Sequence, residues 1–280
     1  MCTTTSATLD QPSFAYVCKL VRDHSAIALE PSKGYLVESR LAPIVARRGL
    51  ASIRDLVAQL RDKPYGEVHA EVVEAMTTNE TSFFRDLHPF DVLKSVVLPE
   101  LIAARAAQRT LSIWSAACSS GQEPDTIAML LLEHFPVLRD WKVEILATDL
   151  SREMLDKARK GEYTQLEVNR GLPSHFLIKY FQREGLRWQV RPDVRRPIRF
   201  VKMNLAEAWP VLPTMDVIFM RNVLIYFTPE TKRAMLAKVR RQLAGDGTLF
   251  LGGAETTIGI DDAWRRVNHG KTSTYRQHCP

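Results

Sequence analysis

The stretch Ser112–Pro124 reads SIWSAACSSGQEP, an apolar run that changes abruptly into small residues and then reaches the acid Glu123. A short apolar run of this kind is typical of a buried strand. Small residues directly after such a strand, among them Ala117 and Gly121, allow a ligand to come close to the backbone. The stretch therefore predicts a strand that ends in a ligand-binding loop.

Short apolar runs alternate with segments of helical spacing along the chain after Leu111. The predicted strands cover residues 111–116, 143–148, 217–220 and 248–251, and the predicted helices cover residues 124–135, 151–159 and 228–243. Alternation of this kind is typical of a parallel sheet with helices on both faces. The sequence therefore predicts an α/β fold for this part of the chain.

Two other parts of the chain have a different character. Residues 11–76 show helical spacing throughout, which predicts a small all-helical domain. Within it, Ser52 is expected to cap one helix and Pro43 to kink or divide another. Between Leu186 and Met203, the segments LRWQV and IRFVKMNL suggest short antiparallel strands of an inserted subdomain.

Ligands of open parallel sheets bind beyond the carboxyl ends of the strands, so the residues after each predicted strand form the candidate site. A dinucleotide site would show the motif GxGxxG, but only Gly121 follows the first strand, which favours a nucleoside without phosphates. Asp149 ends the next strand, where an acid accepts hydrogen bonds from both ribose hydroxyls. An acid at a strand end is also common without any such role.

Together these features suggest S-adenosylmethionine, an adenosine that carries a sulfonium and an amino-acid tail. Glu123 would balance the charge of the tail ammonium or of the sulfonium. The alternative explanation for Glu123 is a favourable acid in the first turn of a helix.

Two further stretches mix polar and apolar side chains near the predicted strand ends. TTNETSFFRD joins the helical part to the sheet and carries Phe83 and Phe84, a composition that suits a lid over a ligand. FMRNVLIYF places Arg221 and Asn222 directly after an apolar strand. Polar side chains at a buried strand end need partners, and a ligand would supply them.

The composition, with 45% hydrophobic and 25% charged residues, is that of an ordinary globular protein. No apolar run approaches the roughly 20 residues that cross a bilayer. Residues 1–10 lack the pattern of a secretory signal and are expected to form a short disordered tail. The 4 cysteines form no CxxC pair, so neither a zinc site nor a disulfide framework is expected, and a reducing cytosol fits.

The net charge of +6 favours acidic partners only mildly. Its distribution is uneven, because residues 33–54 contain the single acid Glu38 beside the basic residues Lys33, Arg40, Arg47, Arg48 and Arg54. Such a run is explained either by a solvated helix face or by an acidic partner. RNA binding would need a stronger basic field and exposed aromatic side chains.

Six motifs occur in the chain in the order TTNETSFFRD, WSAACSSGQEP, ILATDLS, VKMNL, FMRNVLIYF and GTLFLGGAET. In this order and spacing, the chain resembles the CheR-type chemoreceptor glutamate methyltransferases. The resemblance extends from about residue 11 to residue 276. Each motif alone is weak, and the specificity comes from their shared order.

The resemblance implies an all-α N-terminal domain followed by a Rossmann-like methyltransferase domain that depends on S-adenosylmethionine and contains a small antiparallel β-subdomain. In this chain, the helical receptor-docking domain would cover residues 11–76, and a linker with a leading helix would cover residues 77–107. The methyltransferase domain would cover residues 108–280, with the β-subdomain at about 181–200.

The resemblance also implies a set of site residues. Arg85 and Tyr226 would lie near the transferring methyl group and the acceptor as catalytic residues. Glu123 and Asp149 would hold the amino-acid and ribose parts of the cofactor. The residues implied for cofactor binding are Asn79, Thr81, Arg85, Ala117, Gly121, Glu123, Asp149, Asn204, Leu205, Arg221 and Asn222, with Asn204 and Leu205 flanking the adenine, and none is implied to bind a metal.

The implied reaction is methyl transfer to glutamate side chains on the cytoplasmic helices of a chemoreceptor, for sensory adaptation, with S-adenosylhomocysteine as the second product. A glutamate with a pKa of about 4.3 is ionised at neutral pH, so the lack of an evident His or Cys catalyst is no obstacle. Receptor methylation regions are acidic, which makes Arg40, Arg47 and Arg48 the expected docking residues. The protein is expected to be cytoplasmic and monomeric, with no nucleic-acid partner and no membrane insertion.

Two departures from the family pattern bear on these expectations. Asp125 stands after Gln-Glu-Pro, where the family usually has Tyr. The segment FQREGLRWQV is shorter than the glycine-containing loop of members that grip a receptor's C-terminal pentapeptide, so no pentapeptide binding is expected. The alternatives are a methyltransferase for a small molecule or RNA, and a module that binds the cofactor without turnover.

Overall fold

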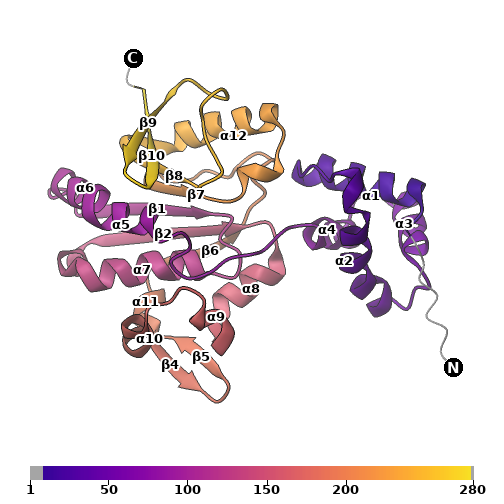
Figure 1. Cartoon of the computed structure of the whole chain (residues 1–280), viewed down its shortest axis with the longest axis horizontal. Coiled ribbons are helices and arrows are strands. Elements are labelled where there is room, and N and C mark those ends of the chain that lie inside the picture. Colours follow the sequence, from indigo (N-terminus) through magenta and orange to yellow (C-terminus); the bar gives the residue numbers. More distant parts are fainter. Residues whose placement is uncertain (1–8, 279–280) are drawn as a thin grey trace. The chain divides into compact units, whose positions relative to one another are not determined.

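The computed structural model describes residues 9–278 and divides the chain into two compact units. The helical unit contains the described residues up to Thr78 together with residues 205–208 and 226–228, and the larger unit contains the rest (Figure 1). The tail expected at residues 1–10 lies, except for Leu9 and Asp10, outside the described residues.

The helical unit consists of α1 (Gln11–Ser25), α2 (Gly34–Arg47), α3 (Ile53–Arg61) and α4 (Glu67–Ala75), with a 3-10 turn before α2. Ser52 accepts a hydrogen bond from the Asp55 backbone N–H at 3.2 Å, as predicted for a capping residue. Pro43 does not divide α2, which continues through it because Leu41 and Ile44 stay buried in the core of the unit.

The larger unit is built on a seven-stranded sheet in the order β6-β2-β1-β7-β8-β10-β9. The strands are β1 (Thr110–Ala116), β2 (Lys142–Asp149), β6 (Ile198–Lys202), β7 (Met215–Met220), β8 (Leu243–Leu251), β9 (Trp264–His269) and β10 (Thr272–Gln277). The first five strands in the sheet order pair in parallel, and β10 pairs antiparallel with both β8 and β9. The sheet is therefore mixed, and the predicted parallel strands form its centre.

Helices accompany the sheet along the chain. They are α5 (His88–Val92), which continues through a π turn into α6 (Leu98–Ala104), then α7 (Gln122–His134), α8 (Arg152–Lys160) and α12 (Pro229–Gln242). Figure 1 shows α7 and α8 beside β2 and β6, and α12 beside β8. The fully buried rings of Phe90 on α5, Phe219 on β7 and Phe250 on β8 stack on one another. Their burial contributes to the hydrophobic stabilisation of the centre of the sheet.

A small antiparallel sheet interrupts the larger unit, in the order β3-β5-β4. It consists of β3 (Glu162–Thr164), β4 (Phe181–Glu184) and β5 (Arg187–Val190), with α9 (Gln165–Asn169), α10 (Ser174–Tyr180) and α11 (Pro192–Arg195) around it. The expectation that IRFVKMNL belongs to this sheet is wrong, because β6 pairs in parallel with β2 at the edge of the large sheet. An edge strand is only half-buried, so its sequence alternates and resembles that of a small exposed sheet.

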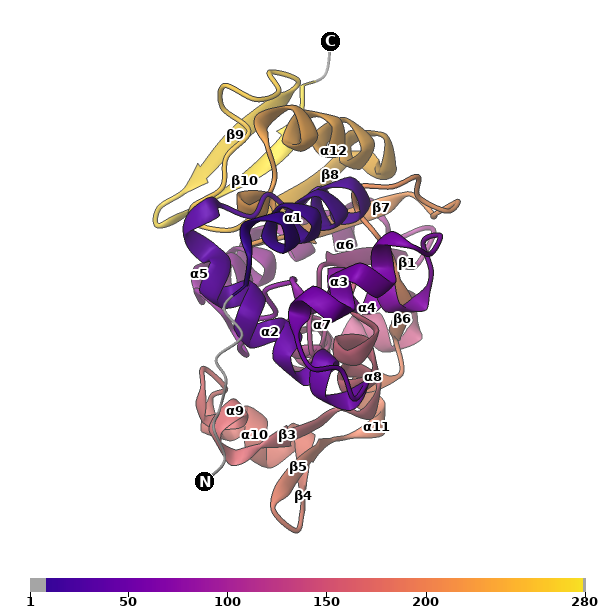
Figure 2. The ribbon, with the colours of Figure 1, turned by 90° about the vertical axis from the view of Figure 1, so that its right-hand side faces the viewer.

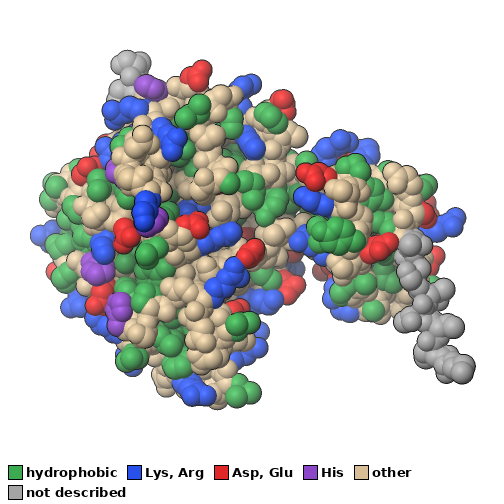
Figure 3. Space-filling view, viewed as in Figure 1, with side chains coloured by type: hydrophobic (Ala, Val, Ile, Leu, Met, Phe, Trp, Pro, Cys, Tyr) green, Lys and Arg blue, Asp and Glu red, His purple; other side chains and the backbone are tan. Residues whose placement is uncertain are grey.

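Figures 1 and 2 place the three-stranded sheet and the β9–β10 hairpin at opposite ends of the larger unit. On the face seen in Figure 3, Lys and Arg side chains are scattered among acidic ones. Among the helices of residues 9–278, none is long and apolar enough to span a bilayer.

Candidate active site

The loop after β1 has a constrained backbone. Ala117, Ser119 and Gly121 have positive φ angles of 59°, 51° and 98°. A Cβ atom on Gly121 would lie 3.0 Å from the Tyr163 hydroxyl and 3.1 Å from the Ala158 Cβ, so both the φ angle and the space require glycine. The small residues therefore let the loop fold closely between its neighbours, in addition to leaving room for a ligand.

Asp149 ends β2 directly beside this loop. Its two carboxylate oxygens accept backbone N–H groups, from Ser119 at 2.8 Å and from Ser151 at 2.9 Å. The carboxylate is buried, and it joins the β1 loop to the start of α8. A carboxylate offers about four lone-pair positions for hydrogen bonds.

Glu123 and Arg221 meet between the ends of β1 and β7. Arg221 Nη1 donates to Glu123 Oε2 at 3.0 Å, and the Ser115 hydroxyl donates to Glu123 Oε1 at 2.8 Å. Arg221 Nη2 donates to Asp86 Oδ2 and to the Arg85 carbonyl, both at 2.8 Å. Three segments that are distant in the sequence are thus connected by one guanidinium group.

The charges of this cluster suit a cationic ligand. Asp86, Glu123 and Asp149 supply carboxylates, and Arg221 supplies the guanidinium that joins two of them. The Arg221 Nε atom is buried and has no hydrogen-bond partner among the residues that the structure describes. An excess of acid beside an unsatisfied buried donor fits a ligand that carries both positive charge and acceptor atoms, as S-adenosylmethionine does.

Burial and the negative charges of Asp149 and Glu123 raise the pKa of the Cys118 thiol well above its usual value. The thiol therefore stays protonated and is no nucleophile. In this loop Cys118 therefore serves as a small apolar residue.

The loop after β7 is held by Glu255, a residue that the sequence motifs contained without indicating its role. Its carboxylate accepts four backbone N–H groups: Gly252 at 2.6 Å, Asn222 at 2.7 Å, Val223 at 2.8 Å and Ile225 at 3.3 Å. Asn222 has a positive φ of 58°, which this anchorage offsets. Glu255 thus fixes the segment that carries Arg221 and Asn222.

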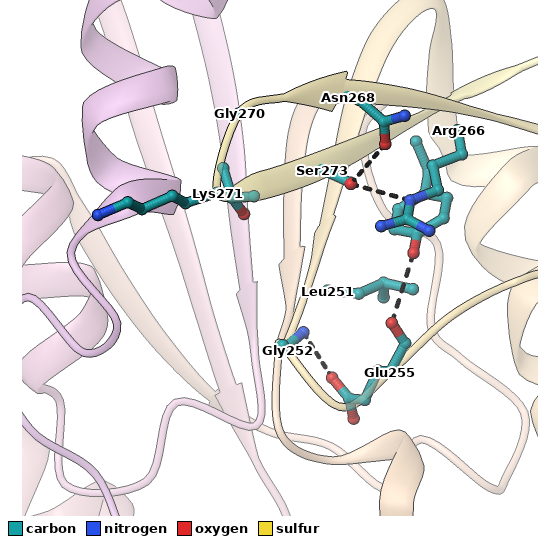
Figure 4. Close-up of a pocket in the computed structure, with 11 residues that line it drawn as sticks. Leu251, Gly252, Glu255, Arg266, Asn268, Gly270, Lys271 and Ser273 are labelled. Carbon is teal, nitrogen blue, oxygen red and sulfur yellow. Dashed lines mark hydrogen bonds between the residues drawn. The ribbon is translucent and has the colours of Figure 1, made fainter.

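A hollow of about 140 Å³ lies beside Glu255 (Figure 4). Its other wall comes from the β9–β10 hairpin, where the Ser273 hydroxyl bridges Arg266 Nε at 2.9 Å and Asn268 Oδ1 at 3.0 Å. The Tyr275 hydroxyl donates to the Glu255 carbonyl at 3.4 Å, so the hairpin and the β7 loop share one anchoring residue.

The phenylalanines of TTNETSFFRD do not form the expected lid. Phe83 is fully buried against Tyr163 and Phe181, and Phe84 is buried against Phe90 and Phe176. Burial of an aromatic ring stabilises a structure by about 1.5–3 kcal/mol, so these rings anchor the segment in the core instead of facing a ligand.

The polar residues of the same segment lie closer to the loop. The Ser119 hydroxyl donates to the Asn79 carbonyl at 2.7 Å, which ties the segment to the loop after β1. Arg85 Nη1 donates to the Glu80 carbonyl at 2.8 Å, and Glu80 forms an ion pair with Arg170. Thr81 is half-buried between these contacts.

The remaining predicted site residues fall in both units of the chain. Asn204 belongs to the larger unit, whereas Leu205 and Tyr226 group with the helical unit. The Tyr226 carbonyl accepts the Ala28 backbone N–H at 3.1 Å.

The expected docking arginines make contacts within the helical unit. Arg40 donates to the Met76 carbonyl at 2.8 Å and to the Thr78 hydroxyl at 3.1 Å. Arg47 and Arg48 both pair with Glu71, at 2.5 Å and 2.7 Å. Arg47 remains 62% exposed in its side chain, so its charge is accessible to a partner.

Comparison with known families matches nearly the whole chain. The family described as "CheR methyltransferase, all-alpha domain" matches residues 12–77, and the family described as "CheR methyltransferase, SAM binding domain" matches residues 79–272. The match places the boundary between the two at the start of the segment that carries Asn79.

Relatives of known name cover most of the chain. "Chemotaxis protein methyltransferase 1" of Pseudomonas aeruginosa is 44% identical over 254 residues, which cover 89% of this chain and 92% of that protein. "Chemotaxis protein methyltransferase 1" of Vibrio cholerae is 39% identical over 267 residues, which cover 94% of this chain and 96% of that protein.

Among solved structures, magnesium protoporphyrin IX methyltransferase from Synechocystis with bound S-adenosylmethionine aligns with a TM-score of 0.38 at 15% identity, over 72% of this chain and 87% of that one. The two family matches and the two named relatives cover nearly the whole chain, including both units of the fold. The chain therefore belongs to the CheR methyltransferase family, with an all-α N-terminal domain and an S-adenosylmethionine-binding domain.

Proposed function

We propose that this protein transfers the methyl group of S-adenosylmethionine to glutamate side chains on the cytoplasmic helices of chemoreceptors. The product is a glutamyl methyl ester, which serves sensory adaptation. The observation that carries the proposal is the acidic cluster around Arg221, where Glu123 and Asp86 converge from the β1 and linker motifs. Family membership supports the reaction class.

The cofactor is proposed to lie across the ends of β1 and β2. Asp149 would accept the ribose hydroxyls, Glu123 would face the amino-acid part, and Asn204 with Leu205 would flank the adenine. The backbone of Ala117 and Gly121 would line the floor. Asn79, Thr81, Arg85, Arg221 and Asn222 would complete the pocket.

When bound, S-adenosylmethionine supplies an electrophilic methyl group on a positively charged sulfur. The acceptor carboxylate is already ionised at neutral pH and reacts without losing a proton, so no general base is needed. The work of the protein is therefore alignment of the acceptor oxygen with the methyl carbon. Arg85 is proposed to orient the acceptor carboxylate through charge-assisted hydrogen bonds, and Tyr226 through its hydroxyl.

Docking of the receptor is proposed to use Arg40, Arg47 and Arg48 of the helical unit. Pentapeptide-independent action is also proposed, and the compact β4–β5 hairpin supports it. Only Gly185 and Leu186 separate the two strands, and the φ of 58° at Gly185 suits so short a turn. We further propose that the protein works as a monomer in the cytoplasm.

The direct test incubates the purified protein with radiolabelled S-adenosylmethionine and membranes that contain a candidate receptor. Base-labile label on receptor glutamates is expected, with none when the acceptor glutamates are changed to alanine. The R85A variant, which retains the cluster around Arg221, is expected to transfer no label. Label on RNA or on small metabolites alone would overturn the proposal.

A further inference from the structure

Asp125 is a charged residue in a fully buried position. It lies on α7, one helical turn after Gly121, and its side chain is 0% exposed. Burial raises the pKa of this carboxyl to about 6, although the Arg195 guanidinium and the Tyr163 hydroxyl favour its charged form. Burying a carboxyl group costs folding free energy unless hydrogen-bonding or charged partners compensate for the lost hydration.

Two segments of the chain, β3 and α11, converge on Asp125. The Tyr163 hydroxyl, on β3 of the small sheet, donates to Asp125 Oδ2 at 2.8 Å. Arg195, on α11, reaches both carboxylate oxygens with Nη1, at 3.3 Å and 3.4 Å. Arg195 Nη2 also donates to the carbonyls of Ala158 and Arg159 at the end of α8. The cluster thus joins α7, α8 and the inserted segment.

The Tyr163 hydroxyl also touches the loop after β1. Its single proton is shared by two acceptors, because the hydroxyl oxygen lies 3.0 Å from the Ser120 carbonyl and 2.8 Å from Asp125 Oδ2. The hydroxyl also occupies the space that a side chain on Gly121 would need. Burial first, and then the charge of Asp125, raise the pKa of Tyr163 well above its usual value, so the hydroxyl keeps its proton. Between the small sheet and this loop, one phenol group therefore forms a direct polar connection.

We infer that Tyr163 is a positioning residue for cofactor binding: its hydroxyl, oriented by Asp125 and Arg195, holds the Ser120–Gly121 backbone in its binding conformation. The small sheet is thereby coupled to the cofactor loop. The inference rests on the proposed position of the cofactor over this loop, and it concerns the affinity for the cofactor and not the identity of the acceptor.

The test measures S-adenosylhomocysteine and S-adenosylmethionine affinity by calorimetry on the full-length protein. Y163F removes only the hydroxyl group and is expected to raise the Kd about tenfold, since a hydrogen bond to a charged group is lost. The KM for the receptor is expected to stay unchanged. The matched control is Y180F, because the Tyr180 hydroxyl also donates to a carboxylate, Glu133, at 2.5 Å, but on α10 away from the loop.

A second variant tests how the hydroxyl is oriented. D125A is expected to raise the Kd as Y163F does, and the double variant is expected to be no weaker than either single variant, because the residues act as one unit. D125N retains a hydrogen-bonding partner for the phenol and is expected to restore most of the affinity. Such a rescue distinguishes positioning from a general loss of stability.

Three outcomes would overturn the inference: wild-type affinity in Y163F, equal losses in Y163F and Y180F, or additive effects of Y163F and D125A. A failure of the proposed cofactor site is recognised separately. If D149N leaves the Kd unchanged, the ribose lies elsewhere and the proposed site is wrong. If D149N weakens binding and Y163F does not, only the positioning role of Tyr163 fails.

Discussion

Arg221 has a side chain that is only 1% exposed, directly after the apolar end of the buried strand β7. Burying a single cation costs several kcal/mol, and the carboxylates of Glu123 and Asp86 offset this cost. The same arrangement leaves the Nε atom of Arg221 unsatisfied among the described residues. At the scale of single residues, the site is therefore a place where stability and ligand binding depend on the same groups.

Asp149 is the residue whose change tests cofactor binding most directly. In D149N, the amide oxygen keeps an acceptor for one of the two backbone N–H groups. At the proposed site, the ribose would lose a charged acceptor. We expect the binding free energy of S-adenosylhomocysteine to weaken by about 1–3 kcal/mol, measured by calorimetry. D156N, which changes an exposed acid paired with Arg159, is expected to bind as the wild type does.

Asp125 predicts a specific pH dependence of stability. Its pKa of about 6 in the folded state lies above the ordinary value of 3.8 for Asp, so the folded protein holds a proton that the unfolded chain releases. This group therefore lowers the free energy of unfolding as the pH rises from about 4 to about 6. Tyr163 and Arg195 face the carboxyl directly, and the buried Cys118 thiol stays neutral throughout.

We expect D125N, which lacks this titration, to gain stability relative to the wild type over the same pH interval, by up to about 3 kcal/mol. Urea unfolding of both proteins at a series of pH values measures the difference. Above pH 7 the difference is expected to be constant. A difference that does not change between pH 4 and 6 would contradict the assigned origin.

At the scale of elements, Glu255 connects the ends of β7 and β8 through four backbone N–H groups. We expect E255Q to lower the free energy of unfolding by about 2–4 kcal/mol, because hydrogen bonds to a charged acceptor are replaced and one amide N–H₂ is left beside other donors. Urea unfolding measures the loss. The control is E100Q, whose half-exposed acid pairs with Arg276 and is expected to matter little.

The central elements of the fold were predictable because their signals are local. The buried parts of β1, β2 and β7 carry short apolar runs, and α7, α8 and α12 follow these strands at the expected positions. The β9–β10 hairpin has a mostly polar sequence and gave no such signal. The role of Glu255 depends on backbone groups about thirty residues away, and no local pattern contains that information.

The sequence predicted which motif residues follow strands, but not which side chains they contact. The sequence placed Glu123, Asp149 and Arg221 after strands, and the strand order explains why they lie along one edge. It did not indicate that Arg221 also binds Asp86, or that Phe83 and Phe84 are core residues. Aromatic residues in a connecting segment suit a lid and an anchor equally well, and only the neighbouring side chains distinguish the two.

At the scale of the whole molecule, the net charge of +6 is modest, so binding of an acidic receptor depends on where basic side chains are grouped. We expect the double variant R47A/R48A to raise the KM for an acidic receptor severalfold and to leave kcat and cofactor affinity unchanged. The effect is expected to shrink at high ionic strength, because salt screens exposed charges. Methylation kinetics at two salt concentrations measure it.

The matched control for this prediction is K19A/R22A, which removes two basic side chains from α1 of the same unit. It is expected to leave the KM unchanged. If both double variants raise the KM equally, the docking depends on total charge and not on α2.

The anchorage of the β7 loop has a consequence for amide hydrogen exchange. Loop amides ordinarily exchange through small local fluctuations, but those of Asn222, Val223, Ile225 and Gly252 all donate to one buried carboxylate. None of the four can open fully without weakening the attachment of the others. Deuterium should therefore enter these positions together and slowly, at rates that resemble those of the strands on either side.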